Sequence, residues 1–476
     1  MDDSVSTQGL PSVSCSQLRE QIRRALVGVA QESQAPIEPL APAAASQRRR
    51  RGRPTELSQA HLWLGLLWAV LEGLSGYRMF TRWLATHAVG GFAPVSLTAS
   101  AVLQRLQQAG FAPLQDVVST LGARMQRGVP APTCALASFA SHILAVDESK
   151  LDALVRRLPW QRQHRVGDPA LLAGQLAALF DIRQQRWLRV QYVSDALRNC
   201  KLEVLALLED LPWHSLLLFD LGYFSFPFFD YLSERDSYWI SRYREKTRYH
   251  LLHVYYQHGV MLDALVWLGS AHGPRAGRAV RLVRFGDGKQ VRMYLTNVRD
   301  PLQLPMGDIA RLSARRWDIE LAFVTLKELL GLHHWWSSQL ALLLQQISVT
   351  LVLAQVLQAL RLHLAEQAGC DPFDVSLPLL VQHLPHLLRA CLHPLDWLLT
   401  HGHKQGFVRP SSRFQVLAPT IPAEQVRPLP ADLVLTRKAN YRTYKPRPPR
   451  PASNQKKQAK ADASASSPPT TRKVYR

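Results

Sequence analysis

The stretch Ser215-Leu-Leu-Leu-Phe-Asp220 is an apolar run that ends in an acid, and a turn at Gly222 follows it. A short apolar run bounded by turn residues predicts a strand buried on both faces. A carboxylate at the end of such a strand is partly desolvated, which is costly unless the protein uses it. The carboxyl ends of strands are also where α/β sheets bind ligands. Asp220 is therefore a candidate functional residue, with a helix N-cap or a solvated loop acid as the alternatives.

The same pattern occurs earlier, where Ile143-Leu-Ala-Val-Asp147 is again an apolar run closed by an acid. Each acid taken singly is more often a cap or a loop residue than a metal ligand. Two such strand ends in one sheet favour a shared site, so Asp147 joins Asp220 as a candidate.

The elements around these strands predict the fold class. A hairpin over 175–182 and 187–193, a helix over 202–211, the buried strand, a helix over 227–233 and a strand over 238–242 follow in that order. This is the order of a ribonuclease-H-like α/β core. Residues 243–300 interrupt the alternation with a β-rich insertion, placed between Asp220 and the next candidate acid, and predict strands over 249–256, 262–268, 279–285 and 290–297.

Helical regions flank this core. We divide the chain into five regions: a variable basic segment, a helical region that could bind DNA, the ribonuclease-H-like domain with its insertion, a helical C-terminal region and a basic tail. Their bounds are 1–55, 56–135, 136–365, 366–436 and 437–476. A capped helix is predicted from Thr55 to Leu74. The short helices Leu97–Ala109 and Pro113–Met125, with Arg105, Arg124 and Arg127, suit a helix-turn-helix reader or an ordinary three-helix lid equally well.

A third acid lies on the helix predicted after the insertion. Its apolar positions Ile319, Ala322, Phe323, Leu326 and Leu330 repeat at helical spacing and define a buried stripe. Arg316, Glu320 and Lys327 are four and seven residues apart and so share one side of the helix. A carboxylate bracketed by two cations is either a catalytic group or one half of an i,i+4 salt bridge on a solvated face.

The charge balance indicates a polyanionic partner. The net charge is +21 and the pI about 10.2. Residues 437–476 hold twelve Lys or Arg and a single acid, and residues 48–53 hold five Arg. Both segments predict mobile arms that contact phosphate backbones, or tails that only aid solubility. Widely spaced cysteines and a polar N-terminus predict a reducing cytoplasm, and glutamines within residues 340–362 favour a buried helix over a membrane span.

These residues also carry a resemblance to a family. Asp220-Leu-Gly-Tyr223 resembles the Asp-x-Gly-Tyr motif of DDE transposases of the insertion-sequence-four family, and Arg316, Glu320 and Lys327 resemble its Tyr-x2-Arg-x3-Glu-x6-Lys signature. The resemblance covers roughly residues 140–345 and implies a DNA transposase. It implies two Mg²⁺ ions, with Mn²⁺ as a substitute, held by Asp147, Asp220 and Glu320.

The resemblance further implies the partners of the chain. Arg316 and Lys327 would hold phosphates of double-stranded DNA, with Tyr223 as a further DNA contact, and paired element ends would need a homodimer on DNA in a bacterial cytoplasm, near the nucleoid. The signature Tyr falls at Ser313 here, and Arg315 is expected to supply part of the lost phosphate contact. Trp239, Trp267 and Tyr294 are either core residues or platforms for a base flipped out of the cleaved end.

Two other functions fit the same residues. A ribonuclease-H-like nuclease would use the same carboxylates without strand transfer. A transposase-derived protein that binds DNA and no longer cuts it is favoured by Ser313 and the basic tail. A binding-only protein would shift DNA without metal and would not respond to the loss of Asp220.

Overall fold

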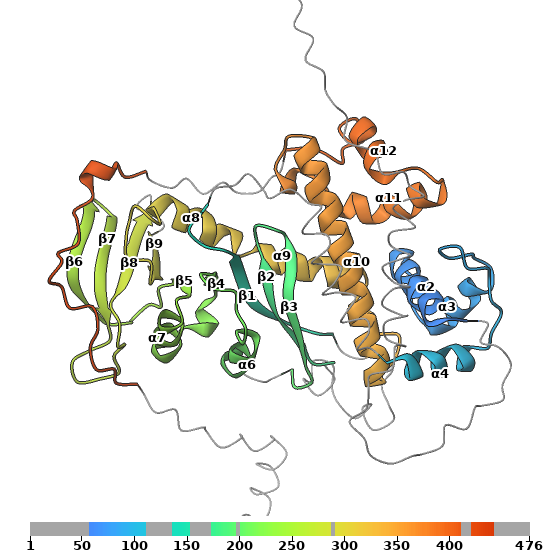
Figure 1. Ribbon diagram of the computed structural model, residues 1–476, viewed down its shortest axis with the longest axis horizontal. Helices are drawn as coiled ribbons and strands as arrows, with labels where there is room; N and C mark the ends of the chain where they lie inside the picture. The colour runs from blue at the N-terminus through green and yellow to red at the C-terminus, as the bar shows by residue number, and fades with distance from the viewer. Residues whose placement is uncertain are drawn as a thin grey trace, which may run out of the picture.

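A mixed sheet of nine strands extends from one end of the molecule to its middle (Figure 1). The computed structural model describes residues 57–110, 136–152, 173–196, 200–286, 291–410 and 420–441. The strand order is β3-β2-β1-β4-β5-β9-β8-β7-β6. β4 and β5 run parallel to β1, whereas β2 and β3 form the predicted antiparallel hairpin beside it. The first five strands are β1 Ile143–Lys150, β2 Gln175–Asp181, β3 Arg186–Val193, β4 Leu216–Phe219 and β5 Tyr238–Arg242.

The β-rich stretch after β5 lengthens this same sheet. β9 pairs antiparallel with β5, with Ile240 opposite Thr296, and β8, β7 and β6 follow outward. The predicted insertion therefore shares its hydrogen-bond ladder with the core strands and does not form a sheet of its own. Its strands are β6 Tyr249–His258, β7 Met261–Leu268, β8 Val280–Gly286 and β9 Val291–Thr296.

Helices cover both faces of the sheet because side chains alternate along each strand. Leu144 and Val146 of β1 pack on the face covered by α6 Cys200–Leu207 and α7 Phe226–Glu234. Ile143 and Ala145 pack on the opposite face, with α8, α9 and α10. These last helices are α8 Met306–Arg315, α9 Asp318–Val324 and α10 Leu340–Gln367, and the π-helical turn η4 Thr325–Leu329 follows α9.

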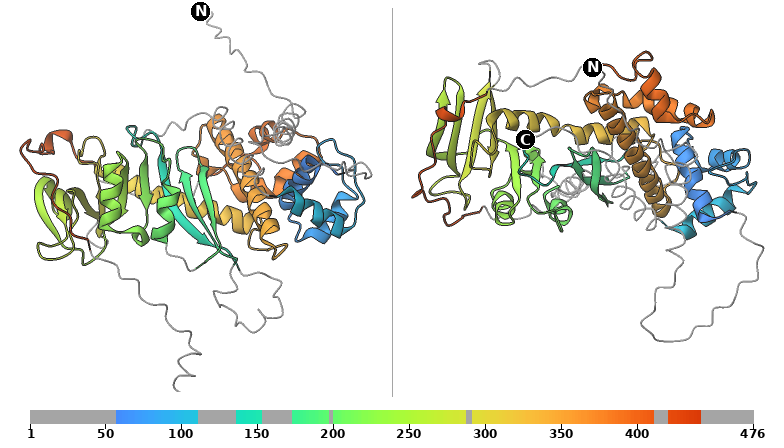
Figure 2. Two further views of the ribbon diagram at one scale, coloured as in Figure 1. Left: turned by 60° about the horizontal axis from the view of Figure 1, so that its bottom comes forward. Right: turned by 45° about the horizontal axis from the view of Figure 1, so that its top comes forward.

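The long helix α10 lies between the sheet and the N-terminal helices, as the orange helix in both views of Figure 2 shows. It is long and apolar enough to cross a membrane by length and composition, and 78% of its most apolar window is buried inside the protein. The N-terminal helices are α2 Gln59–Leu71, α3 Tyr77–Leu84 and α4 Ala99–Ala109; the C-terminal ones are α11 Leu377–Arg389 and α12 Pro394–His401.

The N-terminal helices differ in detail from the sequence prediction. Ser58 caps the first helix, since its hydroxyl accepts a hydrogen bond from the His61 N–H, and the predicted start at Thr55 lies outside the described residues. The helix α3 was not predicted as a separate element. The predicted helix Pro113–Met125 lies outside the described residues, so the helix-turn-helix interpretation stays a prediction.

Residues 420–441 run back along the outer strands in extended form, as the red segment beside β6 and β7 in Figure 1 shows. We call this stretch the C-terminal strap. Its backbone bonds to Tyr255, Arg275, Gly277 and Ala279, and its apolar side chains pack on Tyr255 and Trp267. The Tyr441 hydroxyl donates to Asp230 of α7 at 2.8 Å. The strap therefore joins the outer strands to the helical layer.

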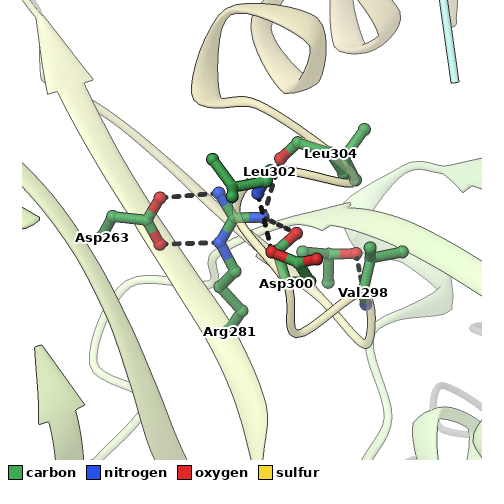
Figure 3. A network of polar contacts seen from close by, with 7 residues as sticks. Asp263, Arg281, Val298, Asp300, Leu302 and Leu304 are labelled. Atoms are coloured by element: carbon green, nitrogen blue, oxygen red, sulfur yellow. Dashed lines mark hydrogen bonds and ion pairs between the residues drawn. The ribbon is translucent and has the colours of Figure 1, made fainter. Parts of the chain in front are cut away.

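A buried ion pair ties the outer strands to the start of α8 (Figure 3). Arg281 of β8 and Asp263 of β7 are 0% and 1% exposed and form two hydrogen bonds, at 2.7 and 2.6 Å. The Arg281 guanidinium also donates to the Leu304 carbonyl at 2.7 Å. Because Leu304 lies two residues before the first residue of α8, this contact fixes the chain where the α8–α9 segment begins.

Replacing Arg281 with Met tests this anchor. The change leaves the Asp263 carboxylate buried without a counter-charge, and we expect a loss of about 3–5 kcal/mol in the free energy of unfolding, measured by urea denaturation. Arg284→Met on the same strand is the matched control, because Arg284 is only half-buried and donates to a single carbonyl. Equal stability of the two variants would show that the anchor is not needed.

Candidate active site

The pairing of β1 with β4 brings Asp147 and Asp220 level with each other. Val146 lies opposite Phe219 in the parallel ladder, so the next residue on each strand is one of the two acids. Ala145 and Leu218 both pack on the face covered by α9, and the alternation of side chains turns Asp147 and Asp220 to that same face. Neighbouring strands lie about 4.8 Å apart, so the sheet itself places the two carboxylates side by side.

Asp147 is not at the end of its strand as predicted. β1 runs on to Lys150, and Asp147 stays paired with Ala178 of β2. What ends at Val146 is the parallel pairing with β4. Asp147 therefore lies at the edge of the parallel part of the sheet while the antiparallel hairpin holds its backbone.

Asp220 stands at an N-cap position but does not cap a helix. It precedes the 3-10 turn η3, Leu221–Tyr223, and its side chain makes no capping hydrogen bond. Its carboxylate is half-buried, and it is close enough to Asp147 to raise the pKa of that acid. The capping alternative is thus excluded for Asp220.

Glu320 comes from α9, whose apolar stripe holds the helix on the sheet. The predicted stripe residues are all buried, and Phe323 packs against Trp187 of β3 at a ring distance of 5.0 Å. The Arg316 guanidinium lies 2.7 Å from Glu320 and 3.9 Å from Asp147. The i,i+4 ion pair predicted as the alternative is therefore present, but it is not on a solvated face, because Arg316 is 8% exposed.

Electrostatics couple the three acids. Burial, and next the negative charges of Glu320 and Asp220, raise the pKa of Asp147 to about 6; the Glu148 N–H and Arg316 oppose this rise without cancelling it. The second oxygen of Glu320, Oε2, is buried and has no hydrogen-bond partner. The cluster thus holds more negative charge than Arg316 alone compensates.

The donor set fits a divalent metal ion. Mg²⁺ prefers carboxylate oxygens, and one oxygen of Glu320 is buried without a hydrogen-bond partner, so the chemistry of these side chains suits such an ion. Within the described residues, no three His, Cys, Asp or Glu side chains are gathered closely enough to hold an ion. Arg316 lies between Asp147 and Glu320 in this arrangement.

The structure places Lys327 at the end of β1, three residues beyond Asp147, and engages the other two predicted DNA contacts, Arg315 and Tyr223, within the protein. The Lys327 ammonium donates to the Lys150 carbonyl at the end of β1, at 3.0 Å. Arg315 forms an ion pair with Asp318 at 3.1 Å and donates to the Ile182 carbonyl, so it braces α9 on the β2–β3 hairpin. Tyr223 is 3% exposed and packs beside Phe219. The predicted DNA contact of Tyr223 has no support here, because its ring has almost no free surface.

The aromatic residues of the predicted base-stacking set are core residues in this structure. Trp239 is fully buried and stacks on Phe229 at 4.3 Å. Tyr294 is 7% exposed and stacks on Phe285. Trp267 is covered by the strap, where the Arg437 guanidinium lies 4.5 Å from its ring centre. All three rings are covered by other parts of the protein. The alternative interpretation, that these residues belong to the core, therefore applies to them.

Sequence analysis missed two features next to the acids. Trp317, Leu321 and Val324 are 59%, 48% and 47% exposed and form an apolar stripe along α9. Their separations of four and three residues place them on one side of the helix, a pattern that could have been recognised in the sequence. Arg244, after β5, donates to the Leu221 carbonyl next to Asp220 at 2.8 Å, a contact that no local pattern announces.

Part of the chain matches a known protein family. Residues 176–354 match the family model described as a transposase DDE domain. The match includes Asp220 and Glu320, lies C-terminal to Asp147, and supports a DDE transposase. No curated protein sequence matches the chain.

Among solved structures, the cryo-EM structure of the piggyBac transposase synaptic complex with hairpin DNA aligns with 86% of this chain and 87% of that chain. The sequences are 11% identical and the TM-score is 0.37. A likeness at that level carries no conclusion about this chain.

The raised pKa of Asp147 predicts that Asp147→Asn stabilises the metal-free protein. An acid with a higher pKa in the folded chain than the ordinary 3.8 lowers stability above pH 6, and this cost disappears as the pH falls toward 4. The difference corresponds to roughly 3 kcal/mol as an upper value. Thermal unfolding in a chelator should show a higher Tm for the variant at pH 7.5 and a much smaller gain at pH 4.

Asp236→Asn, at an exposed acid before β5, serves as the control and should change the Tm little at either pH. A variant at Asp147 that is no more stable than wild type at pH 7.5 would contradict the charge imbalance described above.

Proposed function

We propose that the chain is a DNA transposase of the DDE type that cleaves and joins the ends of an insertion element by metal-dependent phosphoryl transfer. The observation that carries the proposal is the placement of Asp147 and Asp220 on one sheet face, level with each other and facing Glu320. The match to a transposase DDE domain supports the same function. The strand order β3-β2-β1-β4-β5, with the hairpin antiparallel and β4 and β5 parallel to β1, supports a ribonuclease-H-like core with the outer strands as its insertion.

We propose Asp147, Asp220 and Glu320 as the ligands of two Mg²⁺ ions, with Mn²⁺ as a substitute. Such ions activate a water or a 3′-hydroxyl and stabilise the leaving oxygen. Arg316 and Lys327 would then hold phosphate oxygens of the DNA beside the scissile bond, since Arg316 lies beside Asp147 and Lys327 bonds to Lys150, the last residue of the same strand. Arg315 positions α9 and is not assigned a contact with DNA.

The partners follow from this function. Double-stranded DNA, as the element ends and as the target, is the substrate, and a homodimer pairs the two ends. The net charge of +21 favours such a polyanion. We place the protein in the cytoplasm, near the nucleoid, as the sequence analysis predicted.

Cleavage of DNA by purified protein tests the proposal. End-labelled duplexes that carry the sequences flanking the gene are incubated with wild type, Asp220→Asn and Asp236→Asn in Mg²⁺ or Mn²⁺. Several kcal/mol of charge stabilisation depend on a metal ligand, so the Asp220 variant should lose about three orders of magnitude or more in cleavage rate. Asp236, which is exposed in the loop before β5, should tolerate the same chemical change.

The products separate the proposal from its alternatives. Labelled ends joined to a plasmid target identify a transposase, whereas cuts without joining identify a nuclease. Binding without cutting in either metal would refute the enzyme and favour a DNA-binding protein, with Ser313→Tyr as the first reversion to examine. Full activity of the Asp220 variant would remove that residue from the site.

A further inference from the structure

The segment between β5 and β6 carries an unusual concentration of positive charge. Its sequence Arg242-Tyr-Arg-Glu-Lys-Thr-Arg248 holds four cations and one acid. The side chains of Arg242, Arg244, Lys246 and Arg248 are all exposed. None of the four forms an ion pair with a residue in the part of the chain that the structure describes. We call residues 242–248 the basic loop.

The basic loop begins at the edge of the sheet that holds the acids. Arg242 ends β5, which runs parallel to β4, and Asp220 follows the end of β4. Arg244 bonds to the Leu221 carbonyl, and its guanidinium lies 4.8 Å from the ring centre of Phe224. From there the chain leads to β6, the outermost strand of the sheet. The loop thus connects the candidate active site to the outer strands.

The loop is held in one shape by its own contacts. The Tyr243 N–H donates to the Met293 carbonyl at 2.9 Å, and the Tyr243 hydroxyl donates to the Thr247 carbonyl. A turn hydrogen bond joins the Thr247 N–H to the Arg244 carbonyl at 3.2 Å, and Lys246 adopts a left-handed backbone with φ of 66°. Cations on an ordered loop are positioned before a partner arrives, which lowers the entropy cost of binding.

We propose that the basic loop binds the phosphate backbone of the DNA that leaves the active site toward the outer strands. This proposal rests on the proposed function, because it takes DNA to be the substrate. Arg242, Lys246 and Arg248 provide the phosphate contacts, and Arg244 anchors the loop to the turn after Asp220. Such contacts position the duplex and carry no sequence information.

The salt dependence of DNA binding tests this role. Full-length wild type is compared with Arg242→Gln/Lys246→Gln/Arg248→Gln, using a fluorescent duplex of random sequence in a chelator and a series of KCl concentrations. Each phosphate contact contributes about 0.9 to the slope of log K against log salt. The variant should therefore show a slope smaller by about 2 to 3. A loop with a purely structural role would not change this slope.

Lys404→Gln/Arg409→Gln/Arg427→Gln is the matched control, since it removes three exposed cations outside the loop. The control should keep the wild-type slope, and all three proteins should have similar Tm values. An unchanged slope in the loop variant, or an equal loss in the control, would overturn the proposal.

The outcomes distinguish the loop from the catalytic proposal. If wild type does not cut DNA in Mn²⁺ but the loop variant loses slope, the proposed enzyme fails and the loop stands. If wild type cuts DNA and the slope of the loop variant is unchanged, only the loop proposal fails. Wild type that binds no DNA at all would refute both.

Discussion

The parallel pairing of β1 with β4 is the constraint on which the candidate site depends. It fixes Val146 opposite Phe219 and so forces the two following acids onto one face, where their charges oppose each other. Backbone hydrogen bonds of a central sheet cannot relax to relieve that repulsion. The compensating charge comes from the helical layer that covers this face: Arg316, at the end of α8, supplies a cation, and Glu320 of α9 adds a third acid. The site therefore holds three carboxylates beside one cation, Arg316.

The rest of the structure keeps α9 in this position from two directions. On one side, Asp318 accepts hydrogen bonds from Gln185 of the β2–β3 turn and from Arg315. On the other side, the buried Arg281–Asp263 pair holds the segment that leads into α8. The outer strands thus have a structural link to Glu320 although they contribute no acid to it. A change within β7 or β8 can therefore affect the position of α9 through packing.

Much of this arrangement could be predicted from local sequence. The strand Tyr238–Arg242 and the buried stripe of α9 were predicted correctly, because apolar periodicity records burial directly. The extension of β1 from Asp147 to Lys150 could not be predicted. These residues are polar, and they stay in the strand only because β2 pairs with them. The pairing of β5 with β9 is equally non-local, and the strap has no periodicity that reveals its contacts.

At the site, the spacing of Arg316 and Glu320 predicted the i,i+4 ion pair that the structure contains, but no local pattern predicts that Arg316 also reaches Asp147. Tyr223 lies in the core, because the burial of an aromatic ring depends on residues distant in sequence. The central claim is that Asp147, Asp220 and Glu320 form one metal site. Crystals soaked in MnCl2 and measured near the manganese absorption edge test it directly. The account predicts anomalous density bounded by these three carboxylates, and its loss in Asp220→Asn. Crystals of wild type that show no anomalous density there, or show it only elsewhere, would contradict the account.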